Sequence, residues 1–366
     1  MGSIIFWVNT SSEIPKDTSE WVFDILQATT LLTTAANLFG IYLFYYHSTN
    51  AMRGFGTVLS AYQCAATLTD LMVGSALAPY LIFPCPGGLP TGWLKFFGVS
   101  TFVQLFLGAL CLAQMMSLMV TMFIVRQQYI LPLNTFFKLT ERSKYVVYTI
   151  LMVSPTLHLI VIMVYFRLTE DFEAAKEIYL QLYPKLKQFI KDPHFLAFSP
   201  KAAWILLYNI GVWVFLAILG IAEACVTCFY VLAKRKRSIS PRTLRTYHRI
   251  IFKILIQVSI PFITLLIPIL GAIYVFMTDN FGWITLMPFG VALFAQHAFL
   301  STLMSIYLYR PYYSFVIRLC KSLMRRIIPR AALTVFKINE TSSIPPVKVA
   351  PARRFSMAIS ASVSYS

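Results

Sequence analysis

Charged residues are scarce in this chain, and acidic residues are the scarcest. Asp, Glu, Lys and Arg make up 12% of the 366 residues, whereas hydrophobic residues make up 58%. The mean hydropathy of +0.70 is typical of a membrane protein. The net charge of +17 does not indicate nucleic-acid binding, because the basic residues lie in loops between apolar runs. The composition therefore predicts one polytopic membrane domain followed by a polar tail.

Cysteines are also few, and their positions argue against a disulfide framework. Most of the six lie inside apolar runs. The pair Cys225 and Cys228 has the spacing of a redox or zinc motif, but two small buried side chains are the better interpretation within an apolar span. The first residues carry no basic segment followed by a long apolar run, so we expect no cleaved signal peptide.

Catalytic motifs are missing as well. No apolar span carries a Ser-His-Asp set, paired carboxylates or a glycine-rich phosphate loop, so we expect no enzyme activity. No second His or carboxylate follows His158 or His297 at helical spacing, so we expect neither a metal site nor a cofactor.

Residues 96–125 form a stretch of thirty residues without a charged side chain. As a helix it would be roughly 45 Å long, which exceeds the ~30 Å hydrocarbon core of a bilayer. Its polar side chains are few and neutral, whereas a soluble helix of this length would have a polar face. The stretch predicts a tilted transmembrane helix near the middle of a bundle.

Six further apolar segments bring the expected number of spans to seven. In order, the expected spans are residues 22–46, 56–82, 96–125, 145–166, 202–232, 254–278 and 283–309. Between spans four and five, we expect a short surface helix outside the bilayer. The expected parts of the chain are an extracellular N-terminus (1–21), the bundle (22–309), an amphipathic juxtamembrane helix (310–328) and a disordered cytosolic tail (329–366).

The distribution of Lys and Arg predicts the orientation of the bundle. The loops after spans one, three and five, together with the tail, contain 23 Lys and Arg residues, whereas the other side contains 8. The positive-inside rule then places the N-terminus outside and the C-terminus in the cytosol. The expected fold is an all-α membrane protein, a seven-transmembrane helix bundle of the G-protein-coupled receptor type. Asn9, in the sequon Asn-Thr-Ser, would then be a glycosylation site.

Short motifs along the chain resemble those of a known receptor family. Residues 79–84 (Pro-Tyr-Leu-Ile-Phe-Pro) are followed by 88–92 (Gly-Leu-Pro-Thr-Gly), and 173–176 (Glu-Ala-Ala-Lys) by 182–184 (Leu-Tyr-Pro). The later matches are Ser240, Thr243, Gln257, Pro261, Gln296, His297, Ser301, Thr302 and residues 310–312 (Arg-Pro-Tyr). In this order the set is similar to the nematode serpentine chemoreceptors of the Str superfamily, most closely class H and next class I.

The sequence departs from the family pattern in two places. Tyr313 stands where the family often has Arg, and Lys185 stands where many class H members have a Cys. Cys85 therefore has no expected extracellular partner. The Asp-Arg-Tyr and Asn-Pro-x-x-Tyr motifs of rhodopsin-like receptors are also absent.

The resemblance implies a sensory receptor in the plasma membrane of sensory neurons or their cilia. It implies an external, odorant- or pheromone-like small molecule as ligand and a heterotrimeric G protein as cytosolic partner. A seven-span transporter or channel is the alternative, although no internal repeat or chain of intramembrane charges favours it. A third alternative is an intracellular seven-helix protein that aids the trafficking of others. The residues do not decide whether the receptor forms dimers.

Polar residues inside the spans are the first set of candidate site residues. Asp70 is a carboxylate near mid-depth of span two, and both an ion or switch site and a hydrogen-bonded structural role are open. A mostly apolar ligand pocket should open between the outer halves of spans three, five, six and seven. By depth, Gln104, Tyr274, Gln296 and His297 are the ligand-binding candidates, with a hydrogen-bonded packing role as the alternative for His297.

Basic residues at the inner ends of the spans are the second set. Arg126 ends span three, Arg235 and Lys236 end span five, and Lys253 begins span six. The resemblance implies that they frame the crevice where a G protein docks; fixing the topology or contacting anionic lipid is the alternative. Cys320, in the amphipathic segment, suits S-palmitoylation, with an unmodified thiol as the equal alternative.

Overall fold

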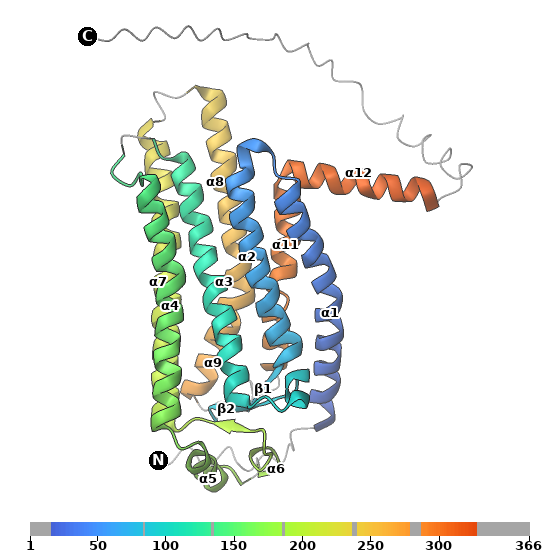
Figure 1. The fold of residues 1–366 in the computed structure, drawn as a ribbon, viewed down its shortest axis with the longest axis vertical. Helices are drawn as coiled ribbons and strands as arrows, with labels where there is room; N and C mark the ends of the chain where they lie inside the picture. Colours follow the sequence, from blue (N-terminus) through green and yellow to red (C-terminus); the bar gives the residue numbers. More distant parts are fainter. Residues whose placement is uncertain are drawn as a thin grey trace. The chain divides into compact units, whose positions relative to one another are not determined.

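A computed structural model describes residues 16–82, 85–132, 135–184, 187–235, 240–278 and 287–327. The chain divides into two units, Met1–Ser314 and Phe315–Ser366. The first unit is a bundle of long helices that run side by side, with a small sheet and short helices at one end (Figure 1). We call this end the sheet end, and the opposite end the basic end, because Arg126, Arg249 and Lys253 lie near it.

Long helices form the first five segments of the bundle, and the second segment closes with a π-helical turn. The bounds are α1 Lys16–Tyr46, α2 Arg53–Leu71 with the π-helix Met72–Ala76, α3 Thr101–Ile130, α4 Glu141–Thr169 and α7 Pro200–Arg235.

The sixth and seventh segments are interrupted helices. The sixth consists of α8 Pro241–Pro261, the π-helix Phe262–Leu266 and α9 Ile267–Thr278. The seventh consists of α10 Met287–Phe294 and α11 His297–Leu308, and α12 Arg310–Ile327 follows it. The interruption of segment six begins directly after Pro261, which cannot donate a backbone hydrogen bond.

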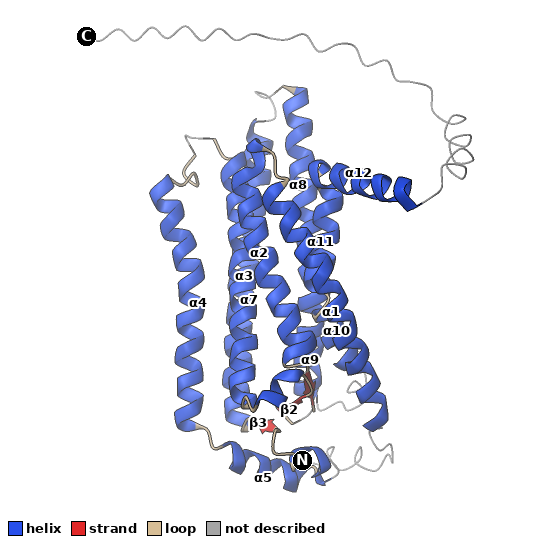
Figure 2. Cartoon of the chain, turned by 45° about the vertical axis from the view of Figure 1, so that its right-hand side comes forward, coloured by secondary structure: helices blue, strands red, loops and turns tan. Residues whose placement is uncertain are grey.

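By length and composition, five of the described helical stretches can cross a membrane. They are Thr101–Ile130, Glu141–Thr169, Pro200–Lys234, Leu255–Val275 and Phe289–Leu308. The second segment is less apolar because α2 carries Gln63, Thr67 and Asp70, and all three are buried. Since α2 packs between α1 and α3 (Figure 2), these polar groups face other helices rather than lipid.

The second span ends earlier than the sequence indicated. We expected it to reach residue 82, but the helix stops at Ala76 and Pro79–Leu81 forms strand β1. Ala78 has a φ of 42°, in the left-handed region through which a right-handed helix cannot continue. The prediction of a helical residue 82 was therefore wrong.

The third span is shifted toward its C-terminus relative to the prediction. Residues Trp93–Phe97 form a separate 3₁₀ turn that ends at Gly98, whose φ is 69°. Helix α3 begins only at Thr101, capped by the Ser100 hydroxyl, and continues to Ile130. Arg126 therefore lies inside the last turn of the helix and does not end it, which corrects the sequence-based prediction.

A three-stranded antiparallel sheet covers the sheet end. Strand β2 Gly87–Pro90 lies between β1 and β3 Leu196–Ala197, with Tyr80 opposite Leu89 and Gly88 opposite Leu196. The expected surface helix is α5 Phe172–Leu182, and a short helix α6 Lys187–Ile190 follows.

The sheet and α5 enclose a small apolar core of their own. Its buried members include Ile82, Ala175, Tyr179 and Phe195. Cys85 lies in the same core as a free thiol, and burial raises the pKa of this thiol to about 12. Since the thiolate is the reactive form of cysteine, Cys85 is a packing residue rather than a reactive one.

The chain directly after β2 approaches the end of segment two closely at Gly92, and this contact can be tested. A Cβ atom at Gly92 would lie 2.2 Å from the Ala76 carbonyl oxygen, a backbone atom that cannot rotate away. We expect Gly92→Ala to cost about 1–3 kcal/mol of stability and to lower the midpoint of thermal unfolding of the purified receptor.

Gly211→Ala is the matched control, because nothing lies within 4 Å of the added Cβ and alanine favours the helix. The midpoint of this variant should be unchanged or higher. Equal midpoints for Gly92→Ala and the wild type would contradict the close contact.

Candidate functional site

The seventh segment is broken in its middle, and Asp70 caps the break. Helix α10 ends at Phe294 and α11 begins at His297, so the first amides of α11 have no carbonyl partner inside the helix. The Ala298 amide donates to Asp70 Oδ2 at 2.7 Å. A carboxylate at a helix N-terminus is also favoured by the helix dipole. A side chain of segment two thus stabilises the start of a helix in segment seven.

His297 joins three segments at the same level. Its Nε2 lies 2.6 Å from the Tyr62 hydroxyl on α2, and its Nδ1 lies 2.8 Å from the Thr264 hydroxyl in segment six. Gln63 Nε2 donates to the Ala298 carbonyl at 2.9 Å. All of these side chains are buried. We call this set the central polar cluster: Tyr62, Gln63, Asp70, Thr264 and His297.

Two oxygen atoms of the central polar cluster accept no hydrogen bond from the described residues. Asp70 Oδ1 and Gln63 Oε1 are buried and have no hydrogen-bond partner among the described residues. A buried acceptor without a partner costs free energy, so these atoms favour a proton, a cation or a water molecule beside them.

Arg126 is a buried cation held by aromatic rings. Its guanidinium carbon lies 4.3 Å from the centre of the Phe55 ring and 5.4 Å from that of Tyr309, and Nη2 donates to the Tyr309 hydroxyl. The ion pairs found among the described residues do not involve Arg126. Cation–π contacts therefore take the place of an acidic partner. Nη1 is buried without a hydrogen-bond partner in the described chain.

Tyr309 is contacted by a second cation from segment six. Lys253 Nζ lies 5.0 Å from the centre of the Tyr309 ring. The Tyr309 hydroxyl donates to Gln257 Oε1 at 3.4 Å, and Gln257 Nε2 donates to the Ser305 hydroxyl at 3.3 Å. We call this set the basic-end cluster: Phe55, Arg126, Lys253, Gln257 and Tyr309. It connects segments two, three, six and seven.

The residues after Arg126 fix the neighbouring elements. Gln127 Nε2 donates to Glu223 Oε1 on α7 at 2.8 Å, which joins segments three and five. The Gln128 side chain accepts from the Leu139 amide and donates to the Phe137 carbonyl, which holds the loop after α3. These two glutamines could not be identified from the sequence, because the hydrogen-bond partners of their side chains lie in other parts of the chain.

The four ligand candidates lie in different surroundings. Gln104 is buried, and its Nε2 donates to the Val99 carbonyl at 2.7 Å, which is a local structural bond. Tyr274 is 49% exposed on α9. Gln296 lies partly buried at the break of segment seven, directly before His297 in the central polar cluster.

The basic candidates are also separated. Arg126 is buried in the basic-end cluster, so it is not exposed to a cytosolic partner in this conformation, contrary to its predicted place at the helix end. The Arg235 side chain, Lys236 and Asn9 lie outside the described residues. Cys320 is exposed on α12.

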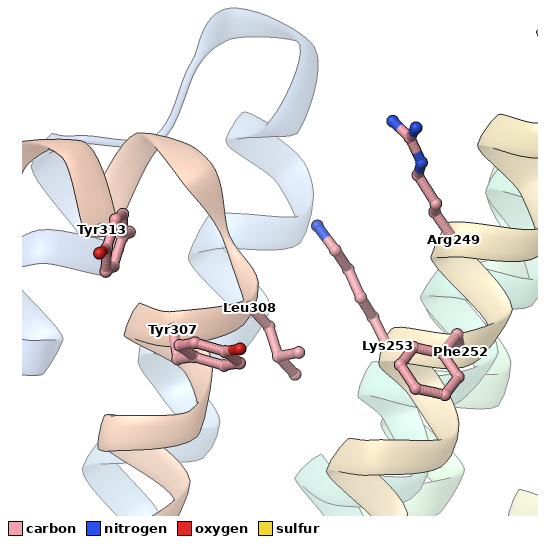
Figure 3. A pocket seen from close by; sticks show the side chains of 6 residues that line it. All are labelled: Arg249, Phe252, Lys253, Tyr307, Leu308 and Tyr313. Atoms are coloured by element: carbon pink, nitrogen blue, oxygen red, sulfur yellow. The ribbon is translucent and has the colours of Figure 1, made fainter. Parts of the chain in front are cut away.

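Lys253 lines a cavity of about 450 Å³ between α8 and α11. Figure 3 shows the side chains of Arg249 and Lys253 extending from α8 toward the gap between the helices. Lys253 precedes the apolar stretch Leu255–Val275. Burial and the charges of Arg126 and Arg249 lower the pKa of Lys253. The lining residues are Arg249, Phe252, Lys253, Tyr307, Leu308 and Tyr313.

Comparison with known proteins agrees with this architecture. No curated protein matches the chain. Among the matching solved structures is squid rhodopsin, with 11% sequence identity and a TM-score of 0.50 over 91% of this chain and 94% of the rhodopsin chain. At this identity the likeness shows a shared fold. The model of the serpentine type seven-transmembrane G-protein-coupled chemoreceptors Srh matches residues 17–322. The chain therefore belongs to the Srh family of chemoreceptors, as the motifs of its loops predicted.

Proposed function

We propose that this G-protein-coupled chemoreceptor senses an external odorant- or pheromone-like molecule in the plasma membrane of sensory neurons or their cilia. The family and the fold are those of receptors that take a small-molecule ligand and couple to a G protein, and receptors of this type are generally not enzymes. The seven-span transporter or channel is not favoured. The excess of Lys and Arg at the basic end supports placing that end in the cytosol.

One observation carries the proposed mechanism: the broken seventh segment is held by other segments at both ends of α11. Asp70 from segment two binds its first turn, and Arg126 from segment three binds Tyr309 directly after its last residue. A rotation or shift of α11 would therefore change both contacts together, which makes α11 a two-state element.

Ligand binding would act on this element through the break. Gln296 and His297 lie at the break, so a ligand that contacts either residue would move α11. Tyr309 would then leave Arg126, and both Arg126 and Lys253 would become accessible to the G protein. Gln104 and Tyr274 remain proposed ligand contacts on the sheet-end side. Arg235 and Lys236 remain proposed contacts of the G protein.

Asp70 is proposed as the ion or switch site within the central polar cluster. Its Oδ2 accepts from the Ala298 amide, whereas its Oδ1 is buried and has no partner among the residues that the structure describes, which supports a proton or a cation at this oxygen. A change of charge at Asp70 would alter the cap of α11 directly. The structural alternative, a carboxylate that only caps the helix, makes a different prediction for the asparagine variant below.

The ends of the chain carry further proposed features. We propose glycosylation of Asn9 on an extracellular segment 1–21, and palmitoylation of Cys320 within an amphipathic helix, 310–328, at the inner membrane surface. We also propose that 329–366, which lie outside the described residues, form a cytosolic tail, and that the receptor can form a dimer. Glycosidase treatment, together with protease access to the tail from the cytosolic side, tests the orientation.

The direct test of the function is a ligand panel on cells that express the chain. We expect at least one volatile or pheromone-like small molecule to change cAMP or calcium, and the response to disappear when heterotrimeric G proteins are blocked. A ligand-evoked current that persists under this block would instead favour a channel.

The role of Tyr309 is testable through basal activity. Tyr309→Leu should raise basal nucleotide exchange of a reconstituted G protein, because Arg126 loses the ring and the hydroxyl of Tyr309 and is left with the Phe55 ring. Tyr309→Phe keeps the ring and loses the hydrogen bond from Arg126, worth about 1.5–3 kcal/mol, together with the bond to Gln257, so its effect should be smaller.

Tyr208→Phe is the control, because Tyr208 is exposed on α7 and lies outside both clusters. Its basal exchange should equal that of the wild type. Wild-type basal exchange in Tyr309→Leu, at equal surface expression, would refute the proposed role.

Two variants at Asp70 separate capping from switching. Asp70→Ala leaves the Ala298 amide buried without an acceptor, so it should cost about 1–3 kcal/mol of stability and lower the thermal midpoint. Asp70→Asn can still accept this bond but has no charge. If Asp70 is a switch, Asp70→Asn should keep a near-wild-type midpoint and shift the ligand concentration for half-maximal signalling. An unshifted response would identify Asp70 as a cap alone.

A further inference from the structure

The cavity between α8 and α11 opens to the surface of the bundle. Phe252 on α8 is 63% exposed, and Tyr307 on α11 is 71% exposed, so the two rings line an open crevice rather than an internal chamber. Arg249 and Lys253 stand one helical turn apart on the same side of α8, as Figure 3 shows. The crevice thus combines two cations with an aromatic wall.

The positive charge of the crevice has no acidic partner among the described residues. None of the lining residues is Asp or Glu, and the ion pairs of the described chain involve neither Arg249 nor Lys253. Arg126 adds a third cation nearby, and the pKa of Lys253 is lowered by burial and by both arginines. An anion in the crevice would relieve this repulsion.

The position of the crevice along the helices matches the headgroup layer of a bilayer. The apolar stretch of segment six begins at Leu255, and that of segment seven ends at Leu308. Arg249 and Lys253 therefore lie just beyond the hydrocarbon region, whereas the exposed rings of Phe252 and Tyr307 lie at its border. Aromatic rings are enriched at this level of membrane proteins.

We propose that this crevice binds the phosphate headgroup of an anionic phospholipid. Arg249 and Lys253 would bind the phosphate, Tyr307 and Tyr313 line the same crevice, and an acyl chain would continue along Phe252. A lipid fits better than an acidic protein segment, because the exposed rings need an apolar partner at the membrane border. The assignment to the cytosolic leaflet, where anionic lipids are concentrated, rests on the proposed orientation.

A bound phosphate would also stabilise the basic end in the conformation described above, in which Arg126 contacts Tyr309. It would bridge α8 and α11 while Lys253 keeps its place over the Tyr309 ring. Anionic phospholipid should therefore raise the midpoint of thermal unfolding of the receptor and lower the basal nucleotide exchange that it causes in the G protein.

The test compares purified full-length receptor in nanodiscs of phosphatidylcholine with and without phosphatidylserine or a phosphoinositide. Retained lipid is measured by native mass spectrometry, and stability by the thermal midpoint. Anionic lipid should raise the wild-type midpoint. In the double variant Arg249→Gln with Lys253→Gln, anionic lipid should no longer raise the thermal midpoint. The amount of anionic lipid that this variant retains should fall by roughly tenfold or more.

Two further double variants serve as controls for the glutamine substitutions. Arg142→Gln with Arg245→Gln removes the same charge outside the crevice, and it should behave like the wild type. Arg249→Lys with Lys253→Arg keeps the charge and should retain the lipid, which shows that the glutamine variant fails through charge rather than misfolding.

Three results would overturn the proposal. The first is equal lipid retention by the two glutamine double variants. The second is unchanged lipid retention with lost activation of the G protein, which would assign the crevice to an acidic protein segment. The third is an equal rise of the midpoint with free inorganic phosphate in phosphatidylcholine nanodiscs. Symmetric nanodiscs make lipid retention and the thermal midpoint independent of the proposed orientation and of the ligand.

Discussion

The amide groups at the break of segment seven set the main constraint on this bundle. Inside a bilayer no bulk water satisfies the free N–H groups at the start of α11, so another segment must supply an acceptor. Asp70 does so for Ala298, and its own burial is tolerable because the carboxylate binds a helix N-terminus. The broken helix and the buried acid thus stabilise each other, and each would be costly alone.

Arg126 presents the complementary problem of a buried cation. Its guanidinium has no acidic partner in the described chain and instead lies between two rings and a hydroxyl. Such an arrangement is weaker than a buried ion pair whose geometry is fully satisfied, and no described residue accepts a hydrogen bond from Nη1. A contact of moderate strength is compatible with the proposed release of Arg126 by a movement of α11, whereas a strong buried ion pair would oppose it.

Sequence patterns predicted the number, the order and most of the extent of the membrane segments, because hydropathy depends on composition alone. They failed where a boundary depends on local backbone geometry, as at Ala78 and Gly98, or on distant partners, as at Arg126. Asp70 and His297 were recognised as unusual because a polar group in an apolar span is conspicuous. Their partners Tyr62 and Thr264 were not, since Tyr and Thr are unremarkable inside membrane helices.

The second segment is not among the five described stretches that are long and apolar enough to cross a membrane, although it packs inside the bundle. A helix that faces lipid must be apolar over most of its surface, as α4 and α7 are, whereas α2 packs against α1, α3 and α11. Its buried Gln63, Thr67 and Asp70 lower its mean hydropathy while they connect it to segment seven or to its own backbone. Low hydropathy in this segment therefore reflects a position inside the bundle.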